Sequence, residues 1–271
     1  MKRTSRVELS NLPEPWQMPA AGQQLGLLPL KPTAVFPPIN GKDQCFYVLD
    51  EDRAPVWCKT DNVDKQLRAT EWISTQLADA LGVRTAGWRI VEYEGETCFG
   101  SPNITSTASS IVVANFLRSS DRAKYGGTSL NRGLYLSGVL ALDMFLHNPD
   151  RHMLNFRLSD DQSYKRLCAI DFADADLSAL TTQWFPVAGS NTVGLIRAVK
   201  AIHGSFAEGA LDMLDRIEGF APAAFRRIVA GVPDDWLRSD LRDNLDGAWG
   251  SSGFSHRLSS LRSGLIDGTL A

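Results

Sequence analysis

Side chains whose oxygen atoms could serve phosphate chemistry gather in the second half of the sequence. Asp150 and Asn155 stand five positions apart in H-N-P-D-R-H-M-L-N, the segment at 147–155, and Asp171 follows a short apolar run in I-D-F. Phosphoryl transfer needs one carboxylate that orients or deprotonates the attacking hydroxyl. It also needs an amide oxygen and a second carboxylate to hold magnesium, a hard ion that prefers oxygen ligands. Asp150 fits the first role, and Asn155 and Asp171 fit the second.

The segment around Asp150 follows a strongly apolar run from Leu134 to Leu146, which predicts a buried helix. A polar cluster at the end of a buried helix needs partners: each other, a metal or a substrate. The step from Asp150 to Asn155 equals the aspartate-to-asparagine step of the protein-kinase catalytic loop H-R-D-x-x-x-x-N. Alone, such a step is common and typical of turn or capping residues. The inference therefore depends on the whole set of residues.

The wording D-R-H-M-L-N, followed by A-I-D-F, resembles the catalytic loop and metal-binding segment of the HipA-like kinases. It is also similar to the loop of the phosphatidylinositol 3-/4-kinases, D-R-H-x-x-N before I-D-F-G. The chain length and the N-P-D-R-H-x-x-N-F wording favour the compact bacterial HipA-like group. The resemblance covers about residues 33–250 and is specific over 147–173, with G-V-P-D-D-W-L at 231–237 as a weaker likeness. It implies a two-lobed protein-kinase-like fold, with ATP and Mg²⁺ as cofactors.

The resemblance also implies a charged pair upstream. Kinases hold the ATP phosphates with a third-strand lysine, which a glutamate on the following helix positions. Lys59 ends the third predicted strand, and Glu71 lies on the apolar face of the next predicted helix. An unpaired carboxylate on such a face would be costly, and Lys59 would supply its charge partner. Without this order of Lys59 before Glu71, Lys59 would be interpreted as an ordinary exposed lysine at the end of a strand.

The sequence departs from the eukaryotic kinase pattern at the phosphate loop and the metal segment. It has no G-x-G-x-x-G, and the loop between the first two predicted strands offers only Asn40, Gly41 and Lys42. We take the backbone amides around Gly41, together with Lys42, as the candidate phosphate cradle. The metal segment has Ala173 where the eukaryotic pattern has glycine.

Neighbouring residues receive secondary roles. We group His152 with Asp150 in the catalytic loop, and we favour a histidine that orients the loop, because base work belongs to Asp150. Arg151 is expected to brace the loop. Asp174 is either an auxiliary metal ligand or, the interpretation we favour, part of a solvated acidic turn. The stretch at 179–192 occupies the place of an activation segment, and a plain surface loop is an equal alternative to a substrate-binding or phosphorylated one.

The elements that must position these side chains divide the chain into a β-rich first part and a helical second part. Alternation and turn residues predict strands over 33–36, 45–49, 55–59, 87–93 and 96–100, with a helix over 63–81. A hinge is predicted over 101–110. Helices are then predicted over 129–146, 191–203, 206–218, 222–230, 234–246 and 254–267, with one β interruption at 166–172 after a polar turn at 159–163.

This order predicts an α+β fold, with a small antiparallel β-sheet N-lobe and a mainly helical C-lobe. The expected organisation is an N-terminal arm over 1–31, an N-lobe over 32–104 and a catalytic C-lobe over 105–271, with ATP between the lobes near the hinge.

Composition excludes several other classes. The chain has 271 residues, with 28 basic and 31 acidic side chains and a net charge of −3, unlike a nucleic-acid binder. The N-terminus lacks the apolar core of a secretory signal, and the longest apolar run is shorter than the roughly 20 residues of a membrane span. Four cysteines without a C-x-x-C pair indicate reduced, mostly buried thiols. We therefore expect a cytoplasmic protein without direct nucleic-acid or membrane partners.

These observations predict a Mg-ATP-dependent phosphotransferase. The resemblance implies a serine/threonine-type kinase with a protein hydroxyl as acceptor, and an antitoxin-like regulatory partner. Two alternatives stay open, because a fold does not determine a substrate. One is a small-molecule kinase of the aminoglycoside or lipid type. The other is a silent nucleotide-binding pseudokinase or regulatory module, in which Asp171 would be turned away from Asp150.

Overall fold

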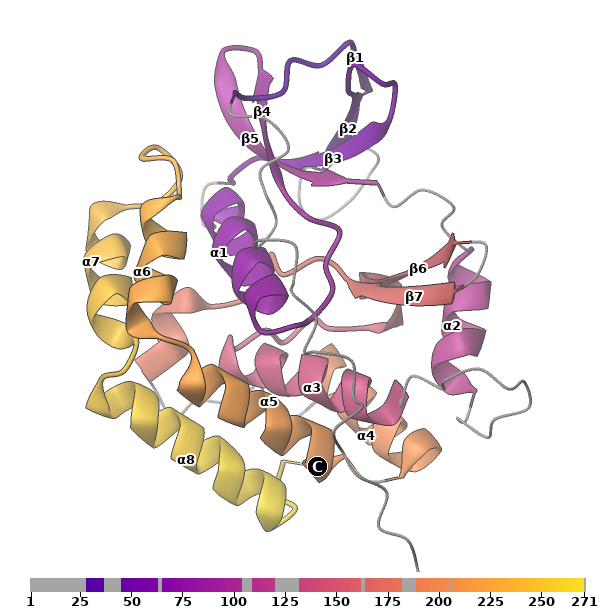
Figure 1. Cartoon of the computed structure of the whole chain (residues 1–271), viewed down its shortest axis with the longest axis vertical. Helices are drawn as coiled ribbons and strands as arrows, with labels where there is room; N and C mark the ends of the chain where they lie inside the picture. The colour runs from indigo at the N-terminus through magenta and orange to yellow at the C-terminus, as the bar shows by residue number, and fades with distance from the viewer. Residues whose placement is uncertain are drawn as a thin grey trace, which may run out of the picture.

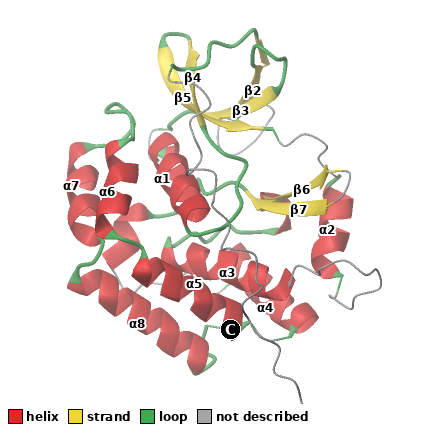
Figure 2. Cartoon of the chain, viewed as in Figure 1, coloured by secondary structure: helices red, strands yellow, loops and turns green. Residues whose placement is uncertain are grey.

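The computed structural model describes most of the chain from residue 28 onward. The sheet of β1 to β5 lies at one end of the molecule and most helices lie at the other, with α1 directly below the sheet (Figures 1 and 2). None of the helices in the described part combines the length and apolar character needed to cross a membrane. The described residues are 28–36, 45–62, 65–103, 109–119, 132–161, 164–181, 189–204 and 206–270.

Five strands form an antiparallel sheet in the order β1-β2-β3-β5-β4. Alternate side chains of this sheet, among them Val48, Val56 and Val91, form a small buried core on one face, as the period of two in a strand requires. The β4–β5 hairpin turns at Glu94 and Gly95, whose φ angles of 52° and 83° suit a type I′ turn. The strands are β1 Ala34–Phe36, β2 Phe46–Leu49, β3 Pro55–Lys59, β4 Arg89–Tyr93 and β5 Glu96–Pro102.

Helix α1, Leu67–Ala80, lies between the sheet and the helical region and contacts both β5 and α6. Its side chains are buried on nearly every side, including Ile73 and Leu77. The helix ends before Gly82, which has a φ of 85°, a left-handed conformation that glycine adopts without a Cβ penalty. The predicted helix and its stop are thereby confirmed.

Helix α3, Arg132–Phe145, is the buried centre of the helical region. It contacts α4 (Asn191–His203), α5 (Ala207–Gly219) and α8 (Ser252–Ile266). Helices α3 and α5 approach so closely that a Cβ atom at Gly209 would lie 2.3 Å from the Leu134 carbonyl oxygen, so only glycine fits there. The remaining helices are α2 Ser110–Arg118, α6 Pro222–Ala230 and α7 Ser239–Ala248, with short 3₁₀ turns η2 Met153–Asn155 and η3 Leu177–Thr181.

A second antiparallel pair, β6 Phe156–Asp161 and β7 Tyr164–Ala169, lies between the larger sheet and the helices (Figure 2). The predicted polar turn at 159–163 was therefore wrong, because 159–161 belong to β6. Phe156 and Leu158 alternate into the core at the start of the strand, and backbone pairing with β7 extends it through the polar residues 159–161.

The prediction of a helix over 234–246 was wrong at its start. The helix begins at Ser239, because the N–H of Trp236 donates to the Pro233 carbonyl in a turn, 3.0 Å away. Trp236 and Leu237 are buried from within that turn. Three further details differ from the prediction: helix α1 begins at Leu67 and not at 63, α2 was not predicted, and β7 ends at Ala169 and not at 172. The α+β prediction itself is confirmed, with the sheet first and the mostly helical region after it.

Candidate active site

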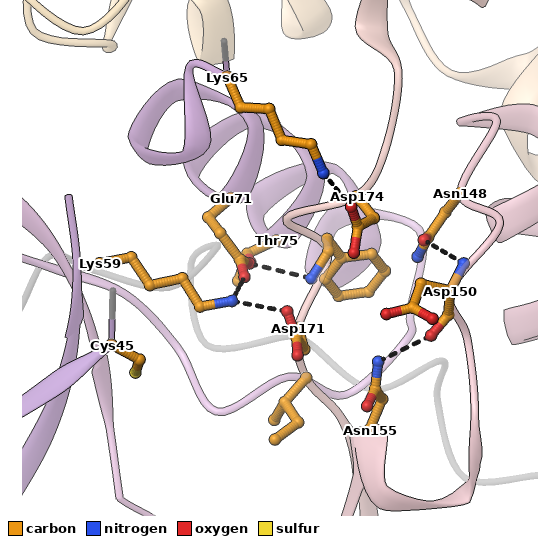
Figure 3. A network of polar contacts seen from close by, with 12 residues as sticks. Cys45, Lys59, Lys65, Glu71, Thr75, Asn148, Asp150, Asn155, Asp171 and Asp174 are labelled. Atoms are coloured by element: carbon orange, nitrogen blue, oxygen red, sulfur yellow. Dashed lines mark hydrogen bonds and ion pairs between the residues drawn. The ribbon is translucent and has the colours of Figure 1, made fainter. Parts of the chain in front are cut away.

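The amino group of Lys59 lies between two carboxylates that are distant in the sequence. Its Nζ is 2.6 Å from Glu71 Oε1 and 2.6 Å from Asp171 Oδ1. Lys59 comes from the end of β3, Glu71 from the early turns of α1, and Asp171 from the loop after β7. Figure 3 shows the lysine side chain reaching from the sheet to both acids. Three separate elements therefore meet at one cation.

Burial and charge together set the ionisation of this group. Burial raises the pKa of the Glu71 carboxyl, an effect that Lys59 opposes. Burial alone would also raise the pKa of Asp171, but Lys59 outweighs it and the pKa is lowered. Burial likewise opposes a charge on Lys59, yet the two carboxylates raise its pKa above the ordinary value. Lys59 and Asp171 are therefore charged at neutral pH, as a phosphate-binding cation and a metal-binding carboxylate must be.

The turn at Asp171 and Phe172 serves both acids. The Phe172 N–H donates to Glu71 Oε2 at 3.1 Å, and the Thr75 hydroxyl lies 3.5 Å from the same oxygen. Asp171 has a φ of 63°, a left-handed conformation that aspartate tolerates better than most residues. This turn lets one residue present its carboxylate to Lys59 while the next residue holds Glu71.

The loop that carries Asp150 is held by hydrogen bonds within itself and to α4. The Asp150 N–H donates to Asn148 Oδ1 at 3.2 Å, and Asn155 Nδ2 donates to the Asp150 carbonyl at 3.2 Å. Asn191, the first residue of α4, donates its Nδ2 to Asp150 Oδ1 at 2.6 Å. Thr192 also bridges the loop and α4, since its hydroxyl bonds Asn148 and Arg151 backbone groups. The Asp150 carboxylate thus has a defined orientation.

Arg151 braces the loop through buried contacts, as expected. It is fully buried and pairs with the fully buried Asp143 of α3, with Nε 2.7 Å from Oδ2 and a second nitrogen 3.0 Å from Oδ1. Its remaining terminal nitrogen donates to the carbonyls of Asn155 and Ile170. The Ile170 N–H in turn donates to the Asn155 carbonyl at 3.0 Å. One guanidinium therefore joins the loop of Asp150 and Asn155 to the segment of Asp171.

A pocket of about 250 Å³ opens beside these groups. Its wall includes Lys59, Glu71 and Asp171, and also the end of β5 at 101–103. Arg157 of β6, Ala169 and Ile170 also line the pocket. In Figure 3, Asp171 lies between the Lys59–Glu71 pair and the side chains of Asp150 and Asn155. The arrangement offers a cation for phosphate in the wall of a pocket that has both apolar and polar lining residues.

The other predicted site residues have different outcomes. His152 Nδ1 accepts from the Leu154 N–H at 3.2 Å and caps η2, a contact that shapes the loop. Asp174 is not a solvated turn residue, because its side chain is 12% exposed and forms an ion pair with Lys65. Gly41 and Lys42 lie outside the described residues.

Three residues of the site were not predicted from the sequence. The position of Asn191 could have indicated it, since it follows a serine at a predicted helix start. Asp143 could also have been indicated, as a carboxylate in a buried helix that needs a partner. Nothing in the sequence indicated Arg157, which lies in an unpredicted strand.

Magnesium fits this donor set. Asn155 uses its amide nitrogen within the loop, so its side-chain oxygen is the remaining ligand atom, and Asp171 supplies an ionised carboxylate. Among the described residues, no group of three or more His, Cys, Asp or Glu side chains forms a ready-made metal site. An ion held by one carboxylate and one amide would complete its shell with phosphate oxygens and water, as Mg²⁺ commonly does.

Comparison with known proteins identifies the fold. No protein-family model and no curated protein sequence matches the chain. The structure is similar to the Helicobacter pylori proinflammatory kinase CtkA, with a TM-score of 0.53 and 10% identity over 86% of this chain and 96% of that one. HipA in the Shewanella oneidensis MR-1 toxin–antitoxin complex with HipB and operator DNA aligns with a TM-score of 0.42 and 14% identity, over 86% of this chain and 62% of that one. The CtkA likeness shows that this is a kinase-like fold.

Proposed function

We propose that this protein is a Mg²⁺-dependent kinase that transfers the γ-phosphate of ATP to a hydroxyl group. The observation that carries the proposal is the position of Lys59 Nζ, 2.6 Å from both Glu71 and Asp171 at the wall of a pocket. Hydrogen bonds join the segment of Asp171 to the loop of Asp150 and Asn155. In this proposal, residues 32–104 form the N-lobe and 105–271 the catalytic C-lobe, with the nucleotide between them.

Each residue has a defined task in the proposed reaction. Lys59, held by Glu71, binds the ATP phosphates, and Asn155 and Asp171 hold the magnesium ion. Bound Mg²⁺ neutralises charge on the phosphate oxygens. Asp150 orients the acceptor hydroxyl and takes up its proton. The hydroxyl oxygen forms a bond to the γ-phosphorus, and the bond from that phosphorus to the bridging oxygen breaks, so that ADP leaves with the electron pair.

The proposed acceptor is a serine or threonine hydroxyl of a protein. The resemblance of D-R-H-M-L-N to the catalytic loop of HipA-like kinases supports this choice. Asp150 does not line the pocket and is half-buried, so an acceptor can approach its carboxylate from outside while the nucleotide occupies the pocket.

Incubation with γ-labelled ATP and magnesium tests the proposal. Wild-type protein is compared with Asp150→Ala and with Asp234→Ala, a control that removes a fully exposed carboxylate of the α6–α7 loop. Acceptors are a generic mixture of serine- and threonine-containing peptides, the chain itself and an aminoglycoside. We expect transfer to protein hydroxyls, lowered at least about a hundredfold by Asp150→Ala and unchanged by the control.

Transfer that survives Asp150→Ala at the wild-type rate would remove Asp150 from the mechanism. Transfer to the aminoglycoside alone would replace the protein acceptor with a small molecule. Nucleotide binding without any transfer would favour a pseudokinase.

A further inference from the structure

Arg68, one turn before Glu71 on α1, joins three parts of the molecule. Its Nε lies 2.8 Å from Asp61 Oδ2, in the segment before α1. One terminal nitrogen donates to the Thr97 carbonyl of β5 at 2.7 Å and to Asp235 Oδ2 at 2.9 Å. The other donates to the Asp235 carbonyl at 3.2 Å. Asp235 belongs to the loop between α6 and α7, so a residue 167 positions away in the sequence holds the start of this helix.

The neighbouring Trp236 completes the contact. It is fully buried, and its ring packs edge to face against Trp72 of α1, with centroids 5.8 Å apart. Its indole Nε1 donates to Thr97 Oγ1 at 2.9 Å. The Arg68 guanidinium lies 5.5 Å from the centroid of the same ring. One residue from the helical region therefore contacts both α1 and the sheet.

Helix α1 is also tied to the helical region near both of its ends. Lys65, just before the helix, pairs with Asp174 in the segment after Asp171. Beyond the last turn, the Leu81 carbonyl accepts from Arg216 of α5 at 3.2 Å. Figure 1 shows α6 beside α1, and the two helices are in contact. Helix α1 is therefore tied to the helical region as well as to the sheet.

We propose that Arg68, Asp235 and Trp236 are positioning residues that hold α1 where Glu71 meets Lys59. This inference rests on the proposed kinase function, in which the lysine–glutamate pair must be in place for phosphate binding. Glu71 follows Arg68 by one turn, so a shift of the helix start carries the Glu71 carboxylate with it. Asp235 and Trp236 of the α6–α7 loop thereby influence how the Lys59–Glu71 pair binds phosphate, although they lie outside the pocket and do not contact the nucleotide.

The test removes these contacts in the folded, full-length protein. Asp235→Ala removes an acid whose side chain is 60% exposed, and Thr97→Val removes the indole acceptor. Asp234→Ala is the matched control, since Asp234 is adjacent and fully exposed and pairs with Arg242 at 3.5 Å. Asp235→Glu tests rescue by a retained charge. The readouts are the Kd for a fluorescent ATP analogue with magnesium and hydrogen–deuterium exchange of 67–80.

We expect Asp235→Ala to raise the Kd roughly two- to fivefold, as loss of a partly exposed charged contact does. The double variant with Thr97→Val should raise it further, with faster exchange in α1 than in α3. Asp235→Glu should recover part of the affinity, and Asp234→Ala should match wild type. A contact that served stability alone would lower Tm without changing the Kd well below Tm.

Wild-type affinity and wild-type α1 exchange in the double variant would overturn the positioning role. Failure of the wild-type protein to bind the analogue would instead count against the proposed kinase function. The exchange data still decide the positioning role in that case, because protected α1 in the double variant refutes it whether or not nucleotide binds.

Discussion

The loop that carries Asp150 should be sensitive to changes in the buried pair of Asp143 and Arg151. Both side chains are fully buried. Asp143 accepts from two nitrogens of Arg151 at 2.7 and 3.0 Å and from Asn148 Nδ2 at 2.8 Å. Asp143→Asn keeps the shape and one acceptor oxygen, but it removes the charge and turns an amide N–H₂ toward a guanidinium. The arginine would then be a buried cation without its ion-pair partner.

Breaking a buried ion pair by changing one partner typically costs about 3–5 kcal/mol. That is a large part of the roughly 5–15 kcal/mol by which domains are stable. At about 2–4 °C per kcal/mol for a chain near this size, Tm should fall by roughly 6–20 °C. Burial raises the pKa of the Asp143 carboxyl and Arg151 opposes this effect, so the charge of this acid depends on its partner.

Urea and thermal unfolding followed by circular dichroism measure the loss. The control is Asp215→Asn, which alters an ion pair of similar length, 2.6 Å to Arg262, whose acid is 72% exposed. Exposed pairs contribute about 0–1 kcal/mol, so the control should unfold close to wild type. If Asp143→Asn is no less stable than Asp215→Asn, then the buried pair does not hold the loop and the reasoning above is wrong.

Three further predictions concern Asn191 of the site, the core thiol Cys98 and the pocket thiol Cys45. In the proposed reaction, Asn191→Ala should lower kcat for phosphate transfer by about tenfold, because Asp150 would lose the hydrogen bond that orients it and misoriented catalytic groups lose rate steeply. Steady-state kinetics should show an unchanged KM for ATP, and a change in KM alone would contradict a role through Asp150. Burial raises the pKa of the Cys98 thiol to about 11, so its alkylation at pH 8 should be very slow and should rise as pH approaches 11. The half-buried Cys45, which lines the pocket, should react at pH 8 and should be protected from alkylation by Mg-ATP. Mass spectrometry of labelled peptides measures the alkylation of both cysteines. If Mg-ATP does not change the labelling of Cys45, the nucleotide binds elsewhere.

Local patterns in the sequence were enough to predict the α+β fold class and to single out Lys59, Glu71 and Asp171, which the structure brings together. The alternation in the strands and the helical period around Leu67 and Leu77 reflect which face each element buries, and that information is local. The order of Lys59 before Glu71 indicated a buried ion pair, since an acid on an apolar face requires a cation. The spacing of Asp150 and Asn155 indicated the likeness to the catalytic-loop motif of kinases. In each case the physical constraint acts within one element or between successive elements.

Tertiary structure alone decided which distant groups complete the site. The contacts of Asp143 with Arg151, of Asn191 with Asp150 and of Asp235 with Arg68 join elements whose separation along the chain says nothing about their separation in space. Strand β6 was missed because its apolar alternation is limited to Phe156 and Leu158, and its polar residues at 159–161 are held by backbone pairing with a partner strand. A sequence determines which side chains need partners through burial and charge, whereas only the packed backbone determines which partner each one meets.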